Sequence, residues 1–217
     1  MKKLLCKEFC LATPKLTYFF LAFTLMTFLP GYPILCGAFF VCFGLFQGYQ
    51  LGREDNDILY SVLLPVSKKE VVIAKYITVV LLQITAFAIC SVCAVVRMTF
   101  LSDVEIYTTN ALMGANLVFL AFVLLIFATF NVIFVGEFFK TAYGIGKPFV
   151  TFIVVNFLII GLAETLHHLP GLDWLNTLDF SCFGEHFLIL VIAVIVYVAS
   201  AVVSCRVSQK RFEKIDL

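Results

Sequence analysis

Long apolar segments, separated by short polar ones, run through the 217-residue chain. A helix needs about 20 mainly apolar residues to cross the hydrocarbon core of a bilayer, and fewer when charged side chains at its ends reach the headgroups. We therefore expect six membrane-spanning helices, at residues 14–29, 33–51, 77–96, 111–135, 148–163 and 187–205. The pattern predicts an all-α polytopic membrane protein, with residues 1–217 forming a single transmembrane domain.

Two segments outside these spans have patterns of their own. Residues 1–13 mix lysines with leucines and a phenylalanine, which predicts a short interfacial helix on the membrane surface; a frayed terminus is the alternative. Residues 164–186 form the longest loop on the outer side, and leucines at helical spacing after Pro170 predict a short interfacial helix there. This loop either caps the outer end of a pathway or is only anchored at the interface by Trp174.

Composition and charge agree with a membrane protein and fix its predicted orientation. Hydrophobic residues make up 62% of the chain and charged residues 13%, which excludes an ordinary soluble domain, and no basic patch indicates a nucleic-acid partner. With the predicted spans, fourteen of the fifteen Lys and Arg residues fall on one side, and only Arg97 falls on the other. Because positive residues accumulate in cytoplasmic loops, both the N- and C-termini are predicted to be cytoplasmic.

The second predicted span carries Gly44, Gly48 and Gly52 at four-residue spacing, which forms two overlapping GxxxG patterns. Such a face lets another helix approach closely in a membrane, where no hydrophobic effect drives helix association. The pattern predicts either packing against another helix of the same chain or a seam between subunits.

No catalytic or metal-binding constellation stands out in the sequence. Glu164, His167 and His168 lie close together, but no further ligand group accompanies them, and we expect no metal. The CxxC pair, Cys90 and Cys93, lies inside an apolar span, where thiols behave as small hydrophobic groups. A phosphate-binding loop is also absent, since the single Gly-Lys pair at 146–147 is followed by proline. We expect neither catalysis nor a bound cofactor on this chain.

Polar residues inside the predicted spans support a second hypothesis. Arg97 and Glu164 are ionisable groups at span ends, and we expect that they could pair across the bundle. Together with Gln83 and Asn131, they are the polar groups that a stand-alone ion-coupled carrier or channel would use.

The most charged internal stretch lies between the second and third spans, at residues 53–76. Its apolar centre is too short to cross a membrane, Asp55 to Asp57 can cap a helix start, and Pro65 can end that helix. Ser67 and Glu70 then have the spacing of a capping box, which predicts the start of the next helix. We expect a helix, a proline break and a second helix, with an exposed apolar face that needs a covering partner.

At this point the sequence resembles a known family. LYSVLLPVSKKEVVIAKY, residues 59–76, is similar to the LPVSRKEIVxxKY signature of small six-span ABC-2 type transporter permeases, with Lys68 where arginine is frequent. The resemblance implies that this loop is a coupling helix that docks on a separate ATPase subunit. The residues expected to form that docking surface are Asp57, Leu59, Tyr60, Leu63, Leu64, Pro65, Val66, Ser67, Lys68, Lys69 and Glu70.

The resemblance also implies a function and a cellular location. It implies the permease subunit of an exporter in the bacterial cytoplasmic membrane, paired with a second copy or a related permease, with ATP and Mg²⁺ bound only by the partner ATPase. Similar small permeases export amphipathic peptide toxins, which implies a hydrophobic or amphipathic substrate, with peptides as one candidate. Phe39, Phe43 and Phe46 could line a path for it, or could simply pack and face lipid.

Overall fold

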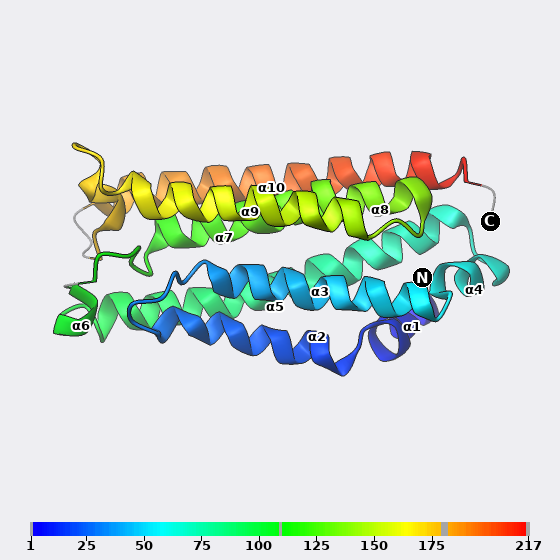
Figure 1. Cartoon of the computed structure of the whole chain (residues 1–217), viewed down its shortest axis with the longest axis horizontal. Coiled ribbons are helices and arrows are strands. Elements are labelled where there is room, and N and C mark those ends of the chain that lie inside the picture. Colours follow the sequence, from blue (N-terminus) through cyan, green and yellow to red (C-terminus); the bar gives the residue numbers. More distant parts are fainter. Residues whose placement is uncertain (1, 109, 179–181, 216–217) are drawn as a thin grey trace.

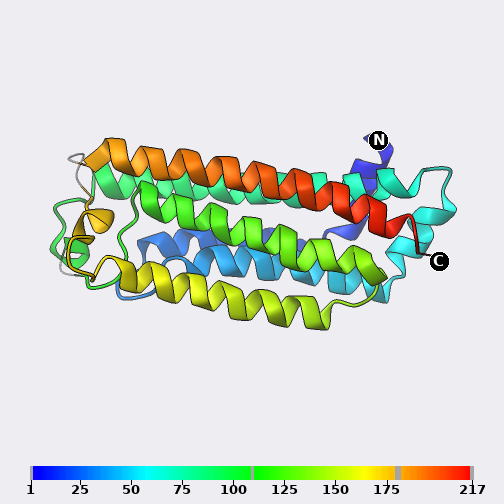
Figure 2. The same ribbon diagram turned by 90° about the horizontal axis from the view of Figure 1, so that it is seen from above.

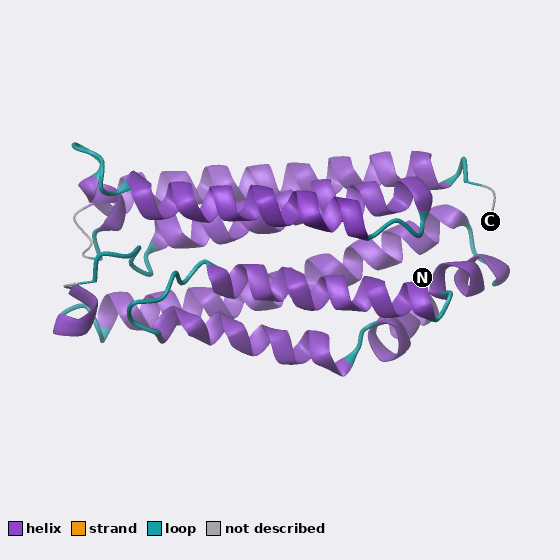
Figure 3. Cartoon of the chain, in the orientation of Figure 1, coloured by secondary structure: helices purple, strands orange, loops and turns teal. Residues whose placement is uncertain are grey.

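The computed structural model describes residues 2–108, 110–178 and 182–215. Within these residues every regular element is a helix, which confirms the all-α prediction (Figure 3). The helical elements are α1 (Lys2–Lys7), η1 (Glu8–Ala12), α2 (Lys15–Phe20), η2 (Leu21–Phe28), α3 (Cys36–Glu54), α4 (Asp57–Leu63), α5 (Lys68–Thr99), α6 (Glu105–Thr108), α7 (Leu117–Thr129), η3 (Phe130–Val135), α8 (Gly136–Thr141), α9 (Gly146–Leu166), η4 (Asp173–Asn176) and α10 (Phe183–Phe212).

The long helices run along one axis in two layers (Figures 1 and 2). One layer contains α2, α3 and α5, and the other contains α7, α8, α9 and α10 (Figure 1). The most buried helix is α7, because it is apolar all round and packs against α5, α9 and α10. The helix α4 and the last turn of α10 lie at one end of the bundle, and α6 lies at the other (Figure 1). We call these the α4 end and the far end.

Among the described residues, four helical segments are long and apolar enough to cross a membrane. They are α5, the continuous segment Leu117–Thr141, α9 and α10, and a fifth candidate joins residues 2–12 to 15–28 through an 82° bend. Helix α3 has 19 residues, but Gln47, Gln50, Arg53 and Glu54 lie in its second half and reduce its hydropathy. The architecture is therefore that of a multi-pass membrane protein with four or five candidate spans by length and composition.

Some helix boundaries differ from those expected. The predicted fourth span starts at residue 111, whereas α7 starts at Leu117, because Asn116 caps it: its Oδ1 accepts the Phe119 N–H at 3.0 Å. The Asn116 amide also donates to the carbonyls of Leu175 and Thr177, at 2.8 and 3.1 Å. The helix expected after Pro170 is a single 3-10 turn, η4. The Asn116 side chain thus begins α7 and hydrogen-bonds the loop before α7 to the turn at η4.

A buried polar network lies in the middle of the bundle. The amides of Gln83 on α5 and Asn131 on η3 hydrogen-bond each other in both directions, at 3.1 and 3.0 Å. Tyr197 of α10 donates to Gln83 Oε1 at 2.8 Å, and Ser204 donates to the Asn131 carbonyl at 2.8 Å. The element η3 is a π-helix, and the Asn131 carbonyl also accepts the Gly136 N–H, five residues later. Both amides are therefore satisfied, and they join α5, η3 and α10.

Candidate functional site

The loop around α4 has the predicted order of helix, proline break and helix. Asn56 precedes α4 in the left-handed region, with a φ of 52°, which turns the chain sharply after α3. Ser67 then begins α5: the Glu70 N–H donates to Ser67 Oγ at 3.3 Å, and the Ser67 N–H donates to Glu70 Oε2 at 2.9 Å. The predicted capping box is confirmed. Helix α5 therefore begins where the capping box predicts, and it continues into the third predicted span, residues 77–96.

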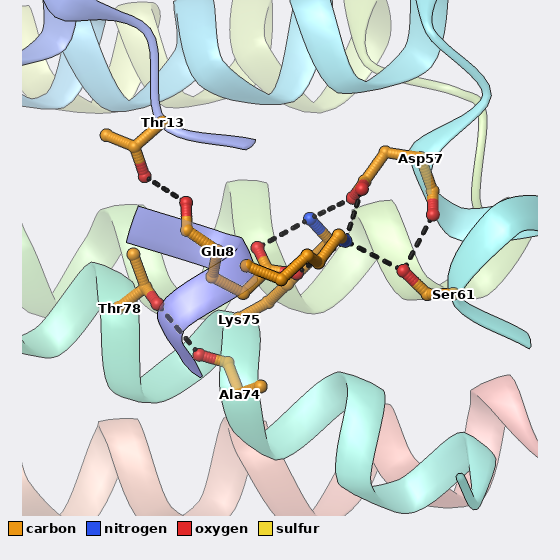
Figure 4. Close-up of polar contacts among 8 residues, drawn as sticks. Glu8, Thr13, Asp57, Ser61, Ala74, Lys75 and Thr78 are labelled. Carbon is orange, nitrogen blue, oxygen red and sulfur yellow. Dashed lines mark hydrogen bonds and ion pairs between the residues drawn. The ribbon is translucent and has the colours of Figure 1, made fainter. Parts of the chain in front are cut away.

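A buried cluster of four charged residues holds α4 in place (Figure 4). Lys75 of α5 pairs with Asp57 of α4 at 2.7 Å and with Glu8 of η1 at 3.0 Å. Lys7 of α1 pairs with Glu8 at 2.9 Å and also with the second carboxylate oxygen of Asp57. All four side chains are at most 11% exposed. Two positive and two negative groups alternate, so every buried charge faces two opposite charges, which offsets the cost of removing it from water.

Neutral groups complete this charge cluster. Lys7 donates to Ser61 Oγ at 2.8 Å, and Ser61 donates to the Asp57 carbonyl at 2.7 Å, one turn earlier on α4. Thr13 donates to the Glu8 carbonyl at 2.8 Å, where η1 ends (Figure 4). The N-terminal segment, α4 and the start of α5 are thereby joined as one unit.

The pKa of Asp57 lies below its ordinary value of 3.8. Burial by itself raises the pKa of this carboxyl, but the charge of Lys75 and hydrogen bonds from Lys7 and Lys75 together outweigh burial. Asp57 is therefore ionised at neutral pH and carries its full charge in the cluster.

The opposite face of α4 is apolar and exposed. Leu59, Tyr60 and Leu63 are 38%, 58% and 77% exposed, and Leu59 and Leu63 are one helical turn apart. Leu11 of η1 is also exposed, and Tyr60 shares with it the lining of a cavity of about 120 Å³ between η1, α3 and α4. A rigidly held helix thus presents two leucines and a tyrosine at the α4 end of the bundle.

The residues predicted to dock an ATPase differ in their exposure and in the contacts that they make within the chain. Leu59, Tyr60, Leu63 and Pro65 are exposed, whereas Leu64, Val66 and Glu70 are half-buried. Asp57 points inward to the charge cluster, and Ser67 and Glu70 bond each other. The C-terminal end of the chain contacts the two lysines: Lys68 donates to the Ile215 carbonyl at 2.6 Å, and Lys69 pairs with Glu213 at 3.1 Å.

Three of the four glycines of α3, the ones at four-residue spacing, face elements of the same chain. A Cβ at Gly44 would lie 2.6 Å from Phe20 Cβ, and the Gly44 carbonyl accepts the Thr17 hydroxyl at 2.7 Å. Gly48 faces Pro14 and Gly52 faces Asp57, both at ordinary contact distances. Of the two alternatives, this geometry favours packing within the chain, between α3 and α2.

The three phenylalanines proposed to line a pathway pack between the two layers. Phe46 stacks on Phe149 of α9, with ring centroids 3.7 Å apart, and Phe43 lies 6.0 Å from the same ring. Phe39 stacks on Phe152 of α9 at 6.3 Å. We call this set of rings, on α3 and α9, the phenylalanine seam. In this conformation its rings fill the space between α3 and α9.

Arg97 and Glu164 bond to different groups. Arg97 donates to the Thr27 carbonyl at 2.9 Å and stacks on the Tyr107 ring at 4.1 Å. Glu164 accepts the Met113 N–H at 2.8 Å. Among the described residues no ion pair joins Arg97 to Glu164, so the expected pair is not formed in this structure.

The charge cluster itself was not predicted from the sequence. The pattern of residues 1–13 predicts a surface helix with Lys7 and Glu8 on its polar face, and Lys75 counts among the charges that predict the orientation. A charged residue within an apolar stretch, such as Lys75 after VVIA, is the one local signal from which a buried partner could have been predicted. Its partners come from segments 18 and 67 residues away, a separation that local patterns do not encode.

The fold and this site define a multi-pass helical membrane protein with an anchored helix at one end. A family model described as ABC-2 family transporter protein matches residues 3–213, nearly the whole chain. The chain therefore belongs to the ABC-2 transporter family and is a membrane component of a transporter, which confirms the predicted family. Searches of curated proteins and of solved structures gave no match.

Proposed function

We propose that this chain is the transmembrane permease subunit of an ATP-driven exporter, and that ATP is hydrolysed on a separate ATPase subunit. The observation that carries the proposal is the exposed apolar face of α4, held rigidly by buried ion pairs. An exposed apolar patch of this kind is typical of a protein interaction site. In this proposal α4 is the coupling helix, and Leu59, Tyr60 and Leu63 contact the ATPase.

The charge cluster supports a route for the motion. When the ATPase subunits close, they push on α4, and the Asp57–Lys75 pair transmits this push directly to α5. Helix α5 has 32 residues and is roughly 48 Å long, which takes it along the whole bundle. Near its other end, Arg97 contacts Thr27 and Tyr107 at the far end. A rigid α5 would couple the two ends of the bundle.

We further propose that six segments cross the membrane, with both termini in the cytoplasm. In this topology, residues 15–28 and α3 are two further spans in addition to the four long helical segments. The polar second half of α3 reaches the α4 end. The distribution of Lys and Arg supports this orientation. Two such subunits, identical or related, would work with two ATPase subunits to export a hydrophobic or amphipathic substrate, for which peptides are our leading candidates.

The docking surface can be tested by changing its leucines. The double variant Leu59→Asp with Leu63→Asp removes apolar contacts that contribute about 1.5–3 kcal/mol for each buried leucine. An affinity-tagged wild-type chain, purified from its native membranes in mild detergent, should bring down an ATPase with a P-loop, identified by mass spectrometry. The double variant should lose it.

The matched control is Leu169→Asp, a change of the same kind at an exposed leucine of the far end. This variant should retain the ATPase, and both variants should elute as the wild-type protein does in size-exclusion chromatography. An ATPase that stays bound to the Leu59→Asp, Leu63→Asp variant would show that α4 is not the docking surface.

A further inference from the structure

Asn156 of α9 is a buried polar residue without a hydrogen-bond partner. Its side chain is 0% exposed, and neither its Oδ1 nor its Nδ2 has a partner among the described residues. Asn131 has the same side chain and the same 0% exposure, but both of its amide atoms bond Gln83. A buried amide without partners is costly, because it has lost its bonds to water and gained none in return.

The position of Asn156 places it in the phenylalanine seam. It lies one turn after Phe152 on α9 and directly before Phe157. The Phe39 ring of α3 is 6.3 Å from the Phe152 ring and 5.5 Å from the Phe157 ring, so it spans the stretch of α9 that contains Asn156. Phe130 of η3 also contacts Phe152, at 5.1 Å. Asn156 therefore lies on the same buried face of α9 as Phe149 and Phe152, the two rings that α9 contributes to the seam.

The seam joins the two layers, because its rings come from α3 in one layer and from α9 in the other (Figure 1). Contacts between aromatic rings can be replaced by contacts with the aromatic side chains of a ligand, which offer the same ring geometry. The amide of Asn156 would gain hydrogen bonds in the same exchange, because it has two donor positions and an acceptor to offer.

We propose that Asn156 is a substrate-recognition residue, which hydrogen-bonds the backbone amides or carbonyls of an apolar peptide that enters the phenylalanine seam when the two layers separate. This inference rests on the proposed exporter function and names its substrate chemistry. The rings of Phe39 and Phe152 bind the apolar side chains of the peptide. The amide selects against ligands that are only hydrocarbon, since those leave it unpaired.

A pair of isosteric variants separates recognition from a structural role. Asn156→Leu removes an unpaired polar group, so it should raise the melting temperature of the permease in nanodiscs by about 2–4 °C. Asn131→Leu breaks both amide bonds with Gln83, and should lower the melting temperature instead. If Asn156→Leu melts at or below the wild-type temperature, the amide has a structural partner and the proposal is wrong.

Peptide binding provides the functional readout. The probe is acetyl-Phe-(benzoyl-Phe)-Leu-amide, photo-crosslinked to the permease in nanodiscs, with attachment sites mapped by mass spectrometry. In the wild type we expect crosslinks within α3 or α9, and in Asn156→Leu a decrease of about two- to tenfold, the range for one net hydrogen bond. A fully N-methylated peptide, which has no N–H donors, should differ less between the two proteins.

Absence of crosslinks in these helices, or an equal yield from wild type and Asn156→Leu, would overturn the proposal. Both measurements use the permease without an ATPase. If the ATPase does not dock at α4, the proposed function is contradicted, but the melting and crosslinking results can still be interpreted. If the Asn156→Leu results are negative, the result of the ATPase co-purification still stands.

Discussion

At the scale of single residues, two kinds of buried polar group have opposite consequences. In the charge cluster, Lys75 faces Asp57 and Glu8, and each partner also faces Lys7. Asn156, by contrast, has no partner among the described residues. A satisfied buried group costs stability when it is removed, whereas an unsatisfied one costs stability while it is present. The first kind therefore stabilises the fold, and the second kind is the basis of our proposal for Asn156.

Lys75→Met should destabilise the protein strongly. It leaves Asp57 and Glu8 buried with only Lys7 to neutralise them, and removing one partner of a buried ion pair costs about 3–5 kcal/mol. Adding Glu8→Gln to this variant should recover part of the loss, because one buried charge then faces one opposite charge. Thermal unfolding in a fixed detergent measures both effects.

Lys69→Met is the control for this prediction. Lys69 pairs with Glu213 on the surface, where an exposed pair contributes about 0–1 kcal/mol. If Lys75→Met unfolds at the same temperature as Lys69→Met, the cluster does not anchor α4.

At the scale of elements, close packing of α2 on α3 depends on the absence of a side chain at Gly44. The Thr17 hydroxyl reaches the Gly44 carbonyl, and the Phe20 Cβ lies where a Gly44 side chain would begin. Because apolar burial does not drive helix association within lipid, such contact geometry decides which faces meet. The face of α3 that carries Gly44 thus determines where the α2–η2 segment packs, because this segment is too short for hydropathy alone to determine its position.

Gly44→Ala should destabilise the chain by about 1–3 kcal/mol, the usual cost of overpacking, although alanine is the better helix former. The added Cβ would lie 2.6 Å from Phe20 Cβ, so α2 must move. Gly161→Ala is the matched change on α9, where no atom lies within 4 Å of the new Cβ, and it should stabilise by about 0.5–1 kcal/mol. Equal melting temperatures for the two variants would show that the glycine face is not tightly packed.

At the scale of the whole molecule, the two layers have different attachments. The layer of α2, α3 and α5 is joined to α4 by the charge cluster. The other layer meets the first through the phenylalanine seam, through the polar network of Gln83 and Asn131, and through the contacts of Lys68 and Lys69 with residues 213–215. In the proposed mechanism, a push on α4 reaches α5 first, through the Asp57–Lys75 pair. The seam, with its unpaired Asn156, lies where the two layers would separate.

Orientation in the membrane is a prediction for the whole chain. Two single cysteines can be introduced into a variant without the native cysteines: Tyr143→Cys and Leu169→Cys. Tyr143 lies between Lys140 and Lys147, Leu169 lies in the loop after α9, and both residues are exposed. A membrane-impermeant maleimide should label the Leu169→Cys variant in intact cells, and the Tyr143→Cys variant only after permeabilisation. The reverse pattern would contradict the assignment of both termini to the cytoplasm.

The sequence by itself determined the helical class, the family and the local structure around Ser67. Hydropathy is summed over neighbouring residues, and a capping box involves residues three apart, so both can be recognised without knowing the fold. A short helix before Pro65 with an exposed apolar face was also predicted correctly, but the capping expected from Asp55 to Asp57 is not formed: Asn56 is the N-cap residue and makes no side-chain capping hydrogen bond.

Only the tertiary structure decided which polar groups have partners. Lys75 meets Glu8 across 67 positions of the chain, Gln83 meets Asn131 across 48, and Arg97 meets Thr27 rather than Glu164. Two asparagines that look alike in the sequence differ in the structure: Asn131 bonds the Gln83 amide, whereas Asn156 has no hydrogen-bond partner among the described residues. Pairing in a bundle depends on how helices rotate against each other, and this rotation is set by contacts between distant segments.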